Sequence, residues 1–170
     1  MRSLAVLAVV GALSLPAAAA AQVWDGAKGV VGKATTGALE REINKRLLDE
    51  SRKNQCSFVT NSDRLAPGCD AKIRRLADAL IRAKKKINGA GVKNFKFVVS
   101  GHTDSRGSAA HNKELSAKRA AVIERELVRK GIPKDDIESV GMGSERRLVK
   151  PDDTPAKQAR NRRYELQVRL

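Results

Sequence analysis

The sequence predicts an α/β sandwich of two layers, with a mixed sheet of about four strands and helices packed on it in βαβαβαβ order. Two observations predict this class. Strand-like apolar runs alternate with stretches of helical periodicity from residue 56 to residue 170. These 115 residues (56 to 170) are enough for one such domain and too few for two.

The first 21 residues have the features of a secretory signal peptide. They hold one charge, Arg2, followed by an apolar run and by alanines that end at Ala21. The apolar run is shorter than the roughly 20 residues that a membrane span needs. No cysteine follows the predicted cleavage site, which disfavours a lipid anchor. We therefore expect export to the periplasm, cleavage near Gln22 and a soluble mature protein, with an association with the outer membrane left open.

Residues 22–55 differ in composition from the rest and are predicted to be a linker with an amphipathic helix. Leu39, Ile43, Leu47 and Leu48 have helical spacing. Three alternatives remain for this helix: it lies on a membrane surface, it pairs with a partner, or it packs on its own domain or acts as a spacer.

The first half of the domain, which starts at Cys56, is predicted to contain two strands and a helix. Residues 57–61 are a short strand candidate. Apolar side chains from Ile73 to Ile87 recur at i, i+3, i+4 and i+7, and Asn88-Gly89 provides a stop, so a helix is expected there. Residues 95–100 form a compact apolar run typical of a central strand.

The second half of the domain begins with a polar turn, residues 101–108, that leads into a helix over about 109–130. Strands are expected at 137–142 and at 164–170, where apolar and polar residues alternate. Thr154-Pro155 is typical of the cap and first turn of a short helix between them.

Cys56 and Cys69 are the two cysteines of the chain, and 12 residues separate them. In an oxidising compartment we expect them to form a disulfide, which would stabilise the fold by about 3 kcal/mol. The alternative is two buried thiols. Neither interpretation gives them a catalytic role.

The net charge favours an anionic partner. Without Arg2, 33 basic residues face 19 acidic ones, a net charge of +14. The 3% aromatic content argues against binding to single-stranded nucleic acid. The carboxylate-rich cell wall and anionic lipid headgroups are the partners that remain for an exported protein, beside a solvated basic surface with no specific partner.

Two charged residues stand where a binding site is expected. Asp104 lies in a polar turn just past an apolar strand, where α/β sheets tend to present ligand-binding groups. Arg119 falls within the apolar arc of the following helix, between Leu115 and Val122. An inward arginine needs an anionic partner, unless its stem covers apolar surface while its head reaches water.

Several spaced motifs together resemble the OmpA-like peptidoglycan-binding domain, over about residues 55–170. They are Gly101-His102-Thr103-Asp104, Gly107-Ser108, His111-Asn112, Leu115-Ser116, Arg119-Ala120, Gly141-Met142-Gly143 and Asn161-Arg162-Arg163-Tyr164-Glu165. The set is far more specific than any one of its members.

The resemblance implies a non-catalytic clamp on the diaminopimelate of the peptidoglycan stem peptide, and hence a role in anchoring or organising the cell envelope. The matching positions assign its acid to Asp104 and its arginine to Arg119. One acid and one arginine suit a group that carries both an ammonium and a carboxylate. Further candidates for the pocket lining are Asn112, Arg162, Thr103 and Asn61. An asparagine after a turn is also a common backbone cap, and Asn161-Arg162-Arg163 also suits a role in tying the last strand to the sheet.

The sequence departs from the family pattern at three positions. Met142 stands where an aromatic residue is usual, His111 replaces a common tyrosine, and Val59 replaces a frequent acid. These changes bear on the affinity and on the preference among stem peptides.

An enzyme is not expected, although His102, Asp104, Ser105, Ser108 and His111 lie within ten residues. Their spacing matches no hydrolase or zinc-protease motif, and such residues are ordinary turn formers. No cofactor and no metal are expected. The alternative function is a basic periplasmic interaction protein that binds anionic lipid or a partner protein and has a degenerate wall site.

Overall fold

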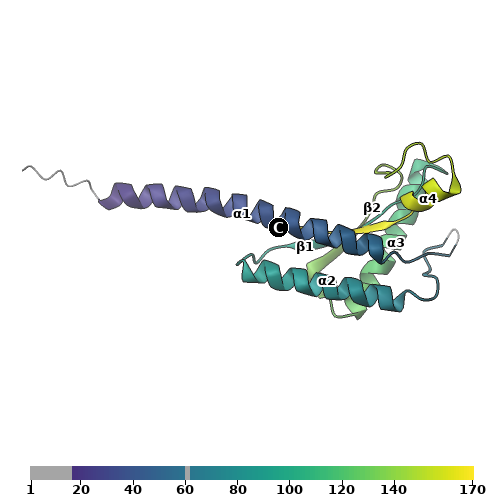
Figure 1. Cartoon of the computed structure of the whole chain (residues 1–170), viewed down its shortest axis with the longest axis horizontal. Helices are drawn as coiled ribbons and strands as arrows, with labels where there is room; N and C mark the ends of the chain where they lie inside the picture. Colours follow the sequence, from purple (N-terminus) through teal and green to yellow (C-terminus); the bar gives the residue numbers. More distant parts are fainter. Residues whose placement is uncertain (1–16, 60–61) are drawn as a thin grey trace, which may run out of the picture. The chain divides into compact units, whose positions relative to one another are not determined.

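The computed structural model of the 170-residue chain describes residues 17–59 and 62–170, with side chains from residue 35 onward (Figure 1). The predicted signal peptide lies outside the described residues, except for positions 17–21, which are helical. The chain divides into two units, Met1–Thr35 and Thr36–Leu170. The second unit contains the sheet and every site discussed below.

The sheet has three strands in the order β2-β1-β3. β1 (Lys96–Gly101) is central and pairs in parallel with β2 (Ile137–Gly141) and antiparallel with β3 (Tyr164–Arg169). The parallel pairing sets Gly101 opposite Gly141, and the antiparallel pairing sets Gly101 opposite Tyr164. The carboxyl ends of β1 and β2 therefore meet at one edge of the sheet.

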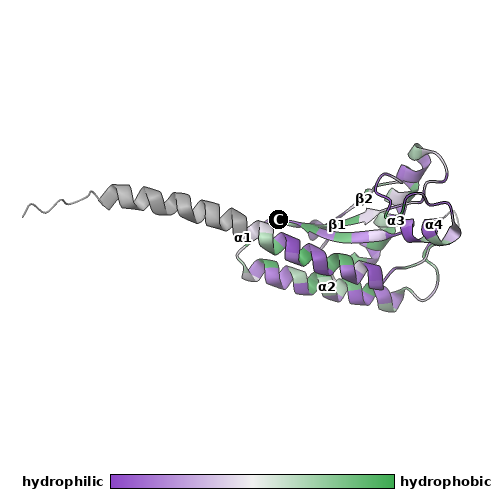
Figure 2. Cartoon of the chain, turned by 45° about the horizontal axis from the view of Figure 1, so that its top comes forward, coloured by the Kyte–Doolittle hydropathy of each residue, from purple (hydrophilic) through white to green (hydrophobic). Residues whose placement is uncertain are grey.

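Helices complete the mixed α/β fold that the sequence predicts. They are α1 (Ala17–Lys53), α2 (Asp70–Gly89), α3 (Ala109–Arg129) and α4 (Pro155–Asn161), with a short 3-10 turn, η1 (Lys134–Asp136), before β2. α3 packs on β1 and β2, and α2 packs beside α3. In Figure 2, α2 carries both hydrophobic and hydrophilic residues along its length, as expected for a helix with one buried face.

The core lies between the sheet and these helices. β3 and the first four residues of β1 alternate buried and less buried positions, so that Phe97, Val99, Leu166 and Val168 all point inward and are almost completely buried. The periodic residues of α2 meet them from the helix layer, with Leu76, Leu80 and Ile87 fully buried. Burying such side chains stabilises the fold by roughly 1.5–3 kcal/mol each.

The prediction of a strand at residues 57–61 is wrong for the residues that the structure describes. Phe58 forms a single antiparallel bridge with Leu65 in place of a strand. The neighbouring bonds, from Val59 N to the Arg64 carbonyl and from Ala66 N to the Ser57 carbonyl, close a narrow loop and not a sheet. Such local pairing leaves residues 57–59 no partner strand in the main sheet, so the described residues form a sheet of three strands instead of four.

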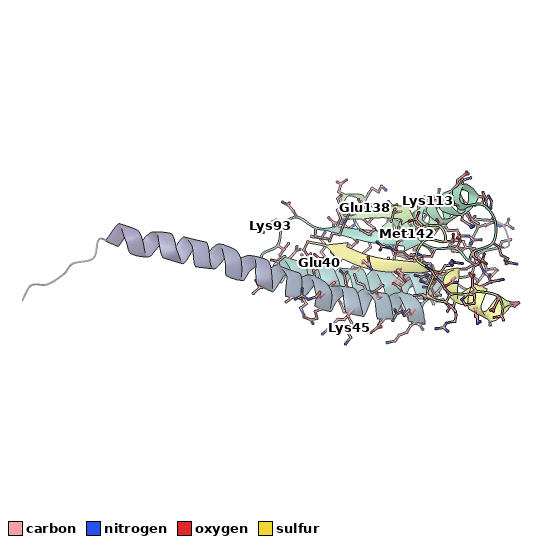
Figure 3. All side chains as sticks on the ribbon, turned by 90° about the horizontal axis from the view of Figure 1, so that it is seen from above. Glu40, Lys45, Lys93, Lys113, Glu138 and Met142 are labelled. Atoms are coloured by element: carbon pink, nitrogen blue, oxygen red, sulfur yellow. The ribbon has the colours of Figure 1, made fainter. Side chains whose placement is uncertain are left out.

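The outer edge of β3 is covered by α1. Alternate N–H groups of β3, and the N–H of Leu170 after it, donate to side chains of α1 and of Gln55 just beyond its end: Tyr164 to Gln55, Leu166 to Ser51, Val168 to Asn44 and Leu170 to Glu40. Figure 3 shows Glu40 on the side of α1 that faces this strand and Lys45 on the outer side. Residues 36–53 thus belong to the compact unit, which begins well before residue 56, where the sequence places the domain boundary.

Candidate functional site

A pair of glycines brings α3 close to the ends of the strands. A Cβ on Gly101 would lie 2.2 Å from the Ser116 carbonyl oxygen, and a Cβ on Gly141 would lie 2.5 Å from the Lys113 carbonyl oxygen. No side chain fits in these spaces, so glycine at both positions lets the helix backbone rest on the sheet. This contact places the first turns of α3 beside the segment that follows β1.

The segment after β1 is held by backbone hydrogen bonds. His102 N donates to the Arg163 carbonyl at 2.8 Å, and Thr103 N donates to the Gly143 carbonyl at 2.9 Å. His102, Thr103 and Asp104 are therefore fixed and buried at the carboxyl end of β1. At the start of α3, Ser108 caps the helix by accepting a hydrogen bond from His111 N.

These elements surround an open cavity of about 1330 Å³. It is lined by residues from the end of α1, from the loop after it, from the turn between β1 and α3, from α3 itself, and from α4 with the residues after it. Of the sequence-predicted site residues, Asp104, Arg119, Asn112, Arg162 and Thr103 all line it. Asn61 lies outside the described residues.

Asp104 is a buried carboxylate with cationic neighbours. Its Oδ2 accepts from Arg162 Nη1 at 2.7 Å and from Arg106 Nη2 at 3.4 Å, and its Oδ1 accepts from Arg106 N at 3.1 Å. The carboxylate side chain is 8% exposed, while those of Arg162 and Arg106 are 37% and 68% exposed. The acid is therefore fixed and its partners have room to move.

Arg119 is held from one side only. Its Nε donates to the Ser62 carbonyl at 3.1 Å, and its Cζ lies 5.0 Å from the centre of the Phe58 ring, a cation–π contact. Neither Nη atom donates to another residue in the described ranges. Burial, the largest effect, and the nearby Arg162 guanidinium lower the pKa of Arg119, and the Asp104 and Asp63 carboxylates oppose this effect.

Asn112 and Thr103 have different roles in the cavity wall. Asn112 Nδ2 donates to the Arg106 carbonyl at 2.8 Å, so this asparagine ties the polar turn to α3. Thr103 Oγ1 is buried and has no hydrogen-bond partner among residues 35–59 and 62–170. Its hydroxyl therefore has hydrogen-bonding capacity that the described residues leave unused.

His102 lines the cavity and has a neutral ring at neutral pH. Both ring nitrogens are buried without a hydrogen-bond partner in the part of the chain that the structure describes. Burial lowers the pKa of His102 to about 4, with Arg163 adding to the effect and Glu165 opposing it. Glu165 Oε2 lies 3.7 Å from His102 Nε2 and its other oxygen accepts from Arg163 Nε.

Sequence reasoning missed Asp152, which joins the two loops that form the cavity wall. Its carboxylate accepts from Ser105 N at 2.9 Å and Ser105 Oγ at 2.5 Å, and also from Asn161 Nδ2 and Arg147 Nη1. The Ser105 hydroxyl, the largest effect, and the Asn161 amide lower the pKa of Asp152 well below its usual range. Asp152 thereby fixes the turn that carries Asp104 relative to the helix end that carries Arg162.

Cys56 and Cys69 stand on either side of the loop that supports Arg119. Cys56 and Cys69 are both buried thiols here, and Cys56 Sγ lies 3.9 Å from the Cys69 carbonyl oxygen. Burial, with Cys69 nearby, raises the pKa of Cys56 to about 12. Such a thiol is unreactive as a nucleophile, and the disulfide stays a prediction for the oxidised protein.

The sequence pattern of the OmpA family matches residues 57–162, which is more than half of the chain. The chain belongs to the OmpA family. The matched range contains Asp104, Arg119, Asn112, Arg162 and Thr103, and it starts after α1.

Known proteins similar to this OmpA-family chain include envelope proteins. The peptidoglycan-associated lipoprotein of Pseudomonas aeruginosa is 37% identical over 82 residues, which cover 48% of this chain and 46% of the lipoprotein. The peptidoglycan-binding protein ArfA of Mycobacterium bovis is 38% identical over 73 residues, which cover 43% of this chain and 22% of ArfA. The chain thus spans less than half the length of these relatives.

Solved structures share the fold. The peptidoglycan-associated lipoprotein of Burkholderia pseudomallei matches with a TM-score of 0.55 and 25% identity, covering 68% of this chain and 89% of that one. A MotB-like protein of Desulfovibrio vulgaris matches with a TM-score of 0.58 and 21% identity, covering 81% of this chain and 94% of that one. The second likeness bears on the fold alone.

The described residues contain neither a membrane-spanning helix nor a cluster of metal ligands. None of the helices combines the length and the apolar character needed to cross a membrane. Within the same ranges, histidine, cysteine and acidic side chains form no group of three or more with the geometry of a metal site.

Proposed function

We propose that the domain binds peptidoglycan without catalysis by gripping the side-chain end of diaminopimelate in the stem peptide. The observation that carries this proposal is the pairing, in one cavity, of a fixed carboxylate with a guanidinium whose Nη donors are unused. Membership of the OmpA family supports it, as do the names of two relatives that refer to peptidoglycan.

The chemistry of the two groups suits this ligand. The Oδ1 atom of Asp104 accepts one hydrogen bond, from Arg106 N, and can accept another from an ammonium. The two Nη atoms of Arg119 can bind a carboxylate in bidentate fashion, because Ser62 and Phe58 already fix the direction of the guanidinium. Each charge-assisted hydrogen bond contributes about 1.5–3 kcal/mol.

The arrangement of hydroxyls and bases argues against hydrolysis. Ser105 Oγ donates to the Asp152 carboxylate, and the ring nitrogens of His102 have no hydroxyl partner in the described residues. Activation of a serine needs a histidine within hydrogen-bond reach of its hydroxyl. The relatives' names likewise describe binding and association.

The proposal is tested by sedimentation of the protein with purified diaminopimelate-type peptidoglycan. Asp104→Asn and Arg119→Gln each remove one charge of the clamp, and Asp78→Asn and Arg82→Gln remove the same charges from exposed positions on α2, outside the cavity. We expect the first two variants to lose about tenfold or more in affinity and the controls to bind like the wild type. Equal binding of all five proteins would contradict the proposal.

We also propose that the protein acts in the periplasm, where it anchors or organises the envelope, with an association with the outer membrane left open. The signal-peptide features of residues 1–21 support export, and relatives include outer membrane protein A of Citrobacter freundii. Fractionation of cells that carry the tagged protein tests this. Recovery in the cytoplasm would contradict it.

A second candidate function rests on the outer face of α2. Arg75, Arg82 and Lys85 are exposed there and have no ion-pair partner in the described ranges, and Ile81 among them is 49% exposed. A basic helix face with an exposed apolar side chain suits the surface of an anionic membrane. Vesicles of anionic lipid should then retain the protein, and the Arg75→Gln/Arg82→Gln/Lys85→Gln variant should be released.

A matched control separates this face from overall charge. Lys118→Gln/Arg125→Gln/Arg129→Gln removes the same three charges from exposed positions of α3. Equal release of both triple variants, or no binding of the wild type to the vesicles, would eliminate the α2 face as a membrane site.

A further inference from the structure

The cavity carries more positive charge than a clamp on diaminopimelate uses. Among the described residues, Asp104 provides the one carboxylate in the cavity lining. Six arginines line it as well: Arg52, Arg106, Arg119, Arg160, Arg162 and Arg163. A cavity with such an excess attracts anions.

Three of these arginines are already engaged within the protein. Arg163 binds Glu165 and the carbonyls of Asn161 and Arg146, and its side chain is 7% exposed. Arg106 and Arg162 both lie against Asp104, so one carboxylate is shared by two cations. These three side chains position the wall and leave a surplus of charge.

The other three arginines lack a strong anionic partner. Arg119 contacts the Ser62 carbonyl and the Phe58 ring, and neither is an anion. Arg160, in the last turn of α4, has no hydrogen-bond or ion-pair partner in residues 35–59 and 62–170. Arg52, in the last turn of α1, lies 3.7 Å from the Asp49 carboxylate. The side chains of Arg52 and Asp49 are 59% and 50% exposed. Such an exposed pair contributes little.

The charge of diaminopimelate alone does not match this surplus. The end of its side chain has one ammonium and one carboxylate, which sum to zero at neutral pH. The neutral groups of the cavity, Thr103 Oγ1 among them, add hydrogen bonds but no charge. A ligand that neutralises the arginines must therefore bring additional carboxylates.

We infer that the site takes a stem peptide in its non-amidated form, and that Arg52 and Arg160 bind a carboxylate other than that of the diaminopimelate side-chain end. This inference rests on the proposed function. An amide in place of the carboxylate has nearly the same size and hydrogen-bonding reach, but no charge, so Arg52 and Arg160 distinguish the two forms electrostatically. The α-carboxylate of the γ-linked glutamate is the candidate group, since it neighbours diaminopimelate.

The test compares two synthetic tripeptides by isothermal titration calorimetry. Both are L-Ala–γ-D-Glu–meso-diaminopimelate, one with all carboxylates free and one with the glutamate α-carboxylate as an amide. For the wild type we expect the free form to bind about tenfold more tightly. In Arg52→Gln/Arg160→Gln the preference should fall to about twofold or less, because the cations that detect the charge are gone.

The control is Arg125→Gln/Arg129→Gln, which loses the same charge from exposed positions of α3 outside the cavity and should keep the tenfold preference. If the wild type binds both peptides equally, the inference is wrong while the proposed function stands. If Arg52→Gln/Arg160→Gln keeps the preference, or the control loses it, the assignment to these two arginines is wrong. If neither peptide binds to any protein, the proposed function itself fails.

Discussion

The side-chain amide of Asn44 is paired with the backbone of Val168 as a neighbouring strand would be. Asn44 Nδ2 donates to the Val168 carbonyl at 3.0 Å, and Val168 N donates back to Asn44 Oδ1 at 2.6 Å. An unpaired strand edge is a template for aggregation, and a helix that covers it removes that liability. α1 is therefore part of the folded domain, although the family match starts after it.

Replacement of Asn44 should therefore destabilise the domain. In Asn44→Ala two backbone groups of Val168 lose their partners, and we expect the free energy of unfolding to fall by about 1–3 kcal/mol. Urea denaturation followed by circular dichroism measures this. Lys45→Ala, at the neighbouring exposed position, is the control and should change the midpoint little. Equal effects of the two substitutions would show that the pairing contributes nothing.

Because α3 packs closely on the sheet at Gly101, adding one methyl group there should strongly destabilise the domain. Gly101→Ala places a Cβ against the Ser116 carbonyl, so α3 must shift away from β1. We expect a loss of several kcal/mol, in the range of overpacked cores or above it, together with weaker peptidoglycan binding. Thermal melts followed by circular dichroism measure this loss. A Cβ at Gly89 meets nothing within 4 Å, so Gly89→Ala should be neutral or slightly stabilising in these melts.

Stability should rise with pH across the range in which His102 titrates. Its pKa of about 4 in the folded state is below the ordinary 6.5, so the unfolded chain binds more protons between these values. The free energy of unfolding should thus increase from about pH 4 to pH 6.5, by a few kcal/mol at most. A pH titration of the ring protons by NMR, with His111→Gln to assign the two histidines, measures the pKa. A His102 pKa near 6.5 would contradict the buried, neutral ring.

The exported protein should contain a disulfide between Cys56 and Cys69. The two residues enclose the loop that holds Arg119 through Ser62, so the bond would stiffen that support. Intact-mass spectrometry of protein from the periplasm should show a mass lower by the two thiol hydrogens than that of the reduced protein. Ready alkylation of both cysteines in unreduced, unfolded protein would show that the bond is absent.

Local patterns predicted most of the elements. The helix periodicity between Ile73 and Ile87 corresponds to α2, and the predicted strand at 95–100 corresponds to β1 within one residue. The strand predicted at 57–61 is not formed over the described residues 57–59, because a short apolar run cannot show whether a partner edge is available. The free edge of β3 is occupied by side chains of α1 and by Gln55. Their helical spacing in the sequence indicates one face of a helix but does not indicate which strand that face meets.

The site was predicted in part for a similar reason. Asp104 and Arg119 carry recognisable motifs, and the structure places both in the wall of one cavity. Asp152 is 47 residues from its partner Ser105 and lies in a loop where an acid has no distinctive spacing. The excess of arginines was equally hidden, because Arg52 and Arg160 come from different helices and meet the same cavity only in the folded chain.

The central claim is that Asp104 and Arg119 recognise the charged end of diaminopimelate. The most direct test is calorimetric titration with two stem tripeptides that differ only in the third residue, diaminopimelate or lysine. Lysine keeps the ammonium and lacks the carboxylate, so Arg119 loses its ligand, and we predict binding about tenfold weaker or more. In Arg119→Gln this difference should nearly vanish. Equal affinity of the wild-type protein for the two peptides would contradict the account.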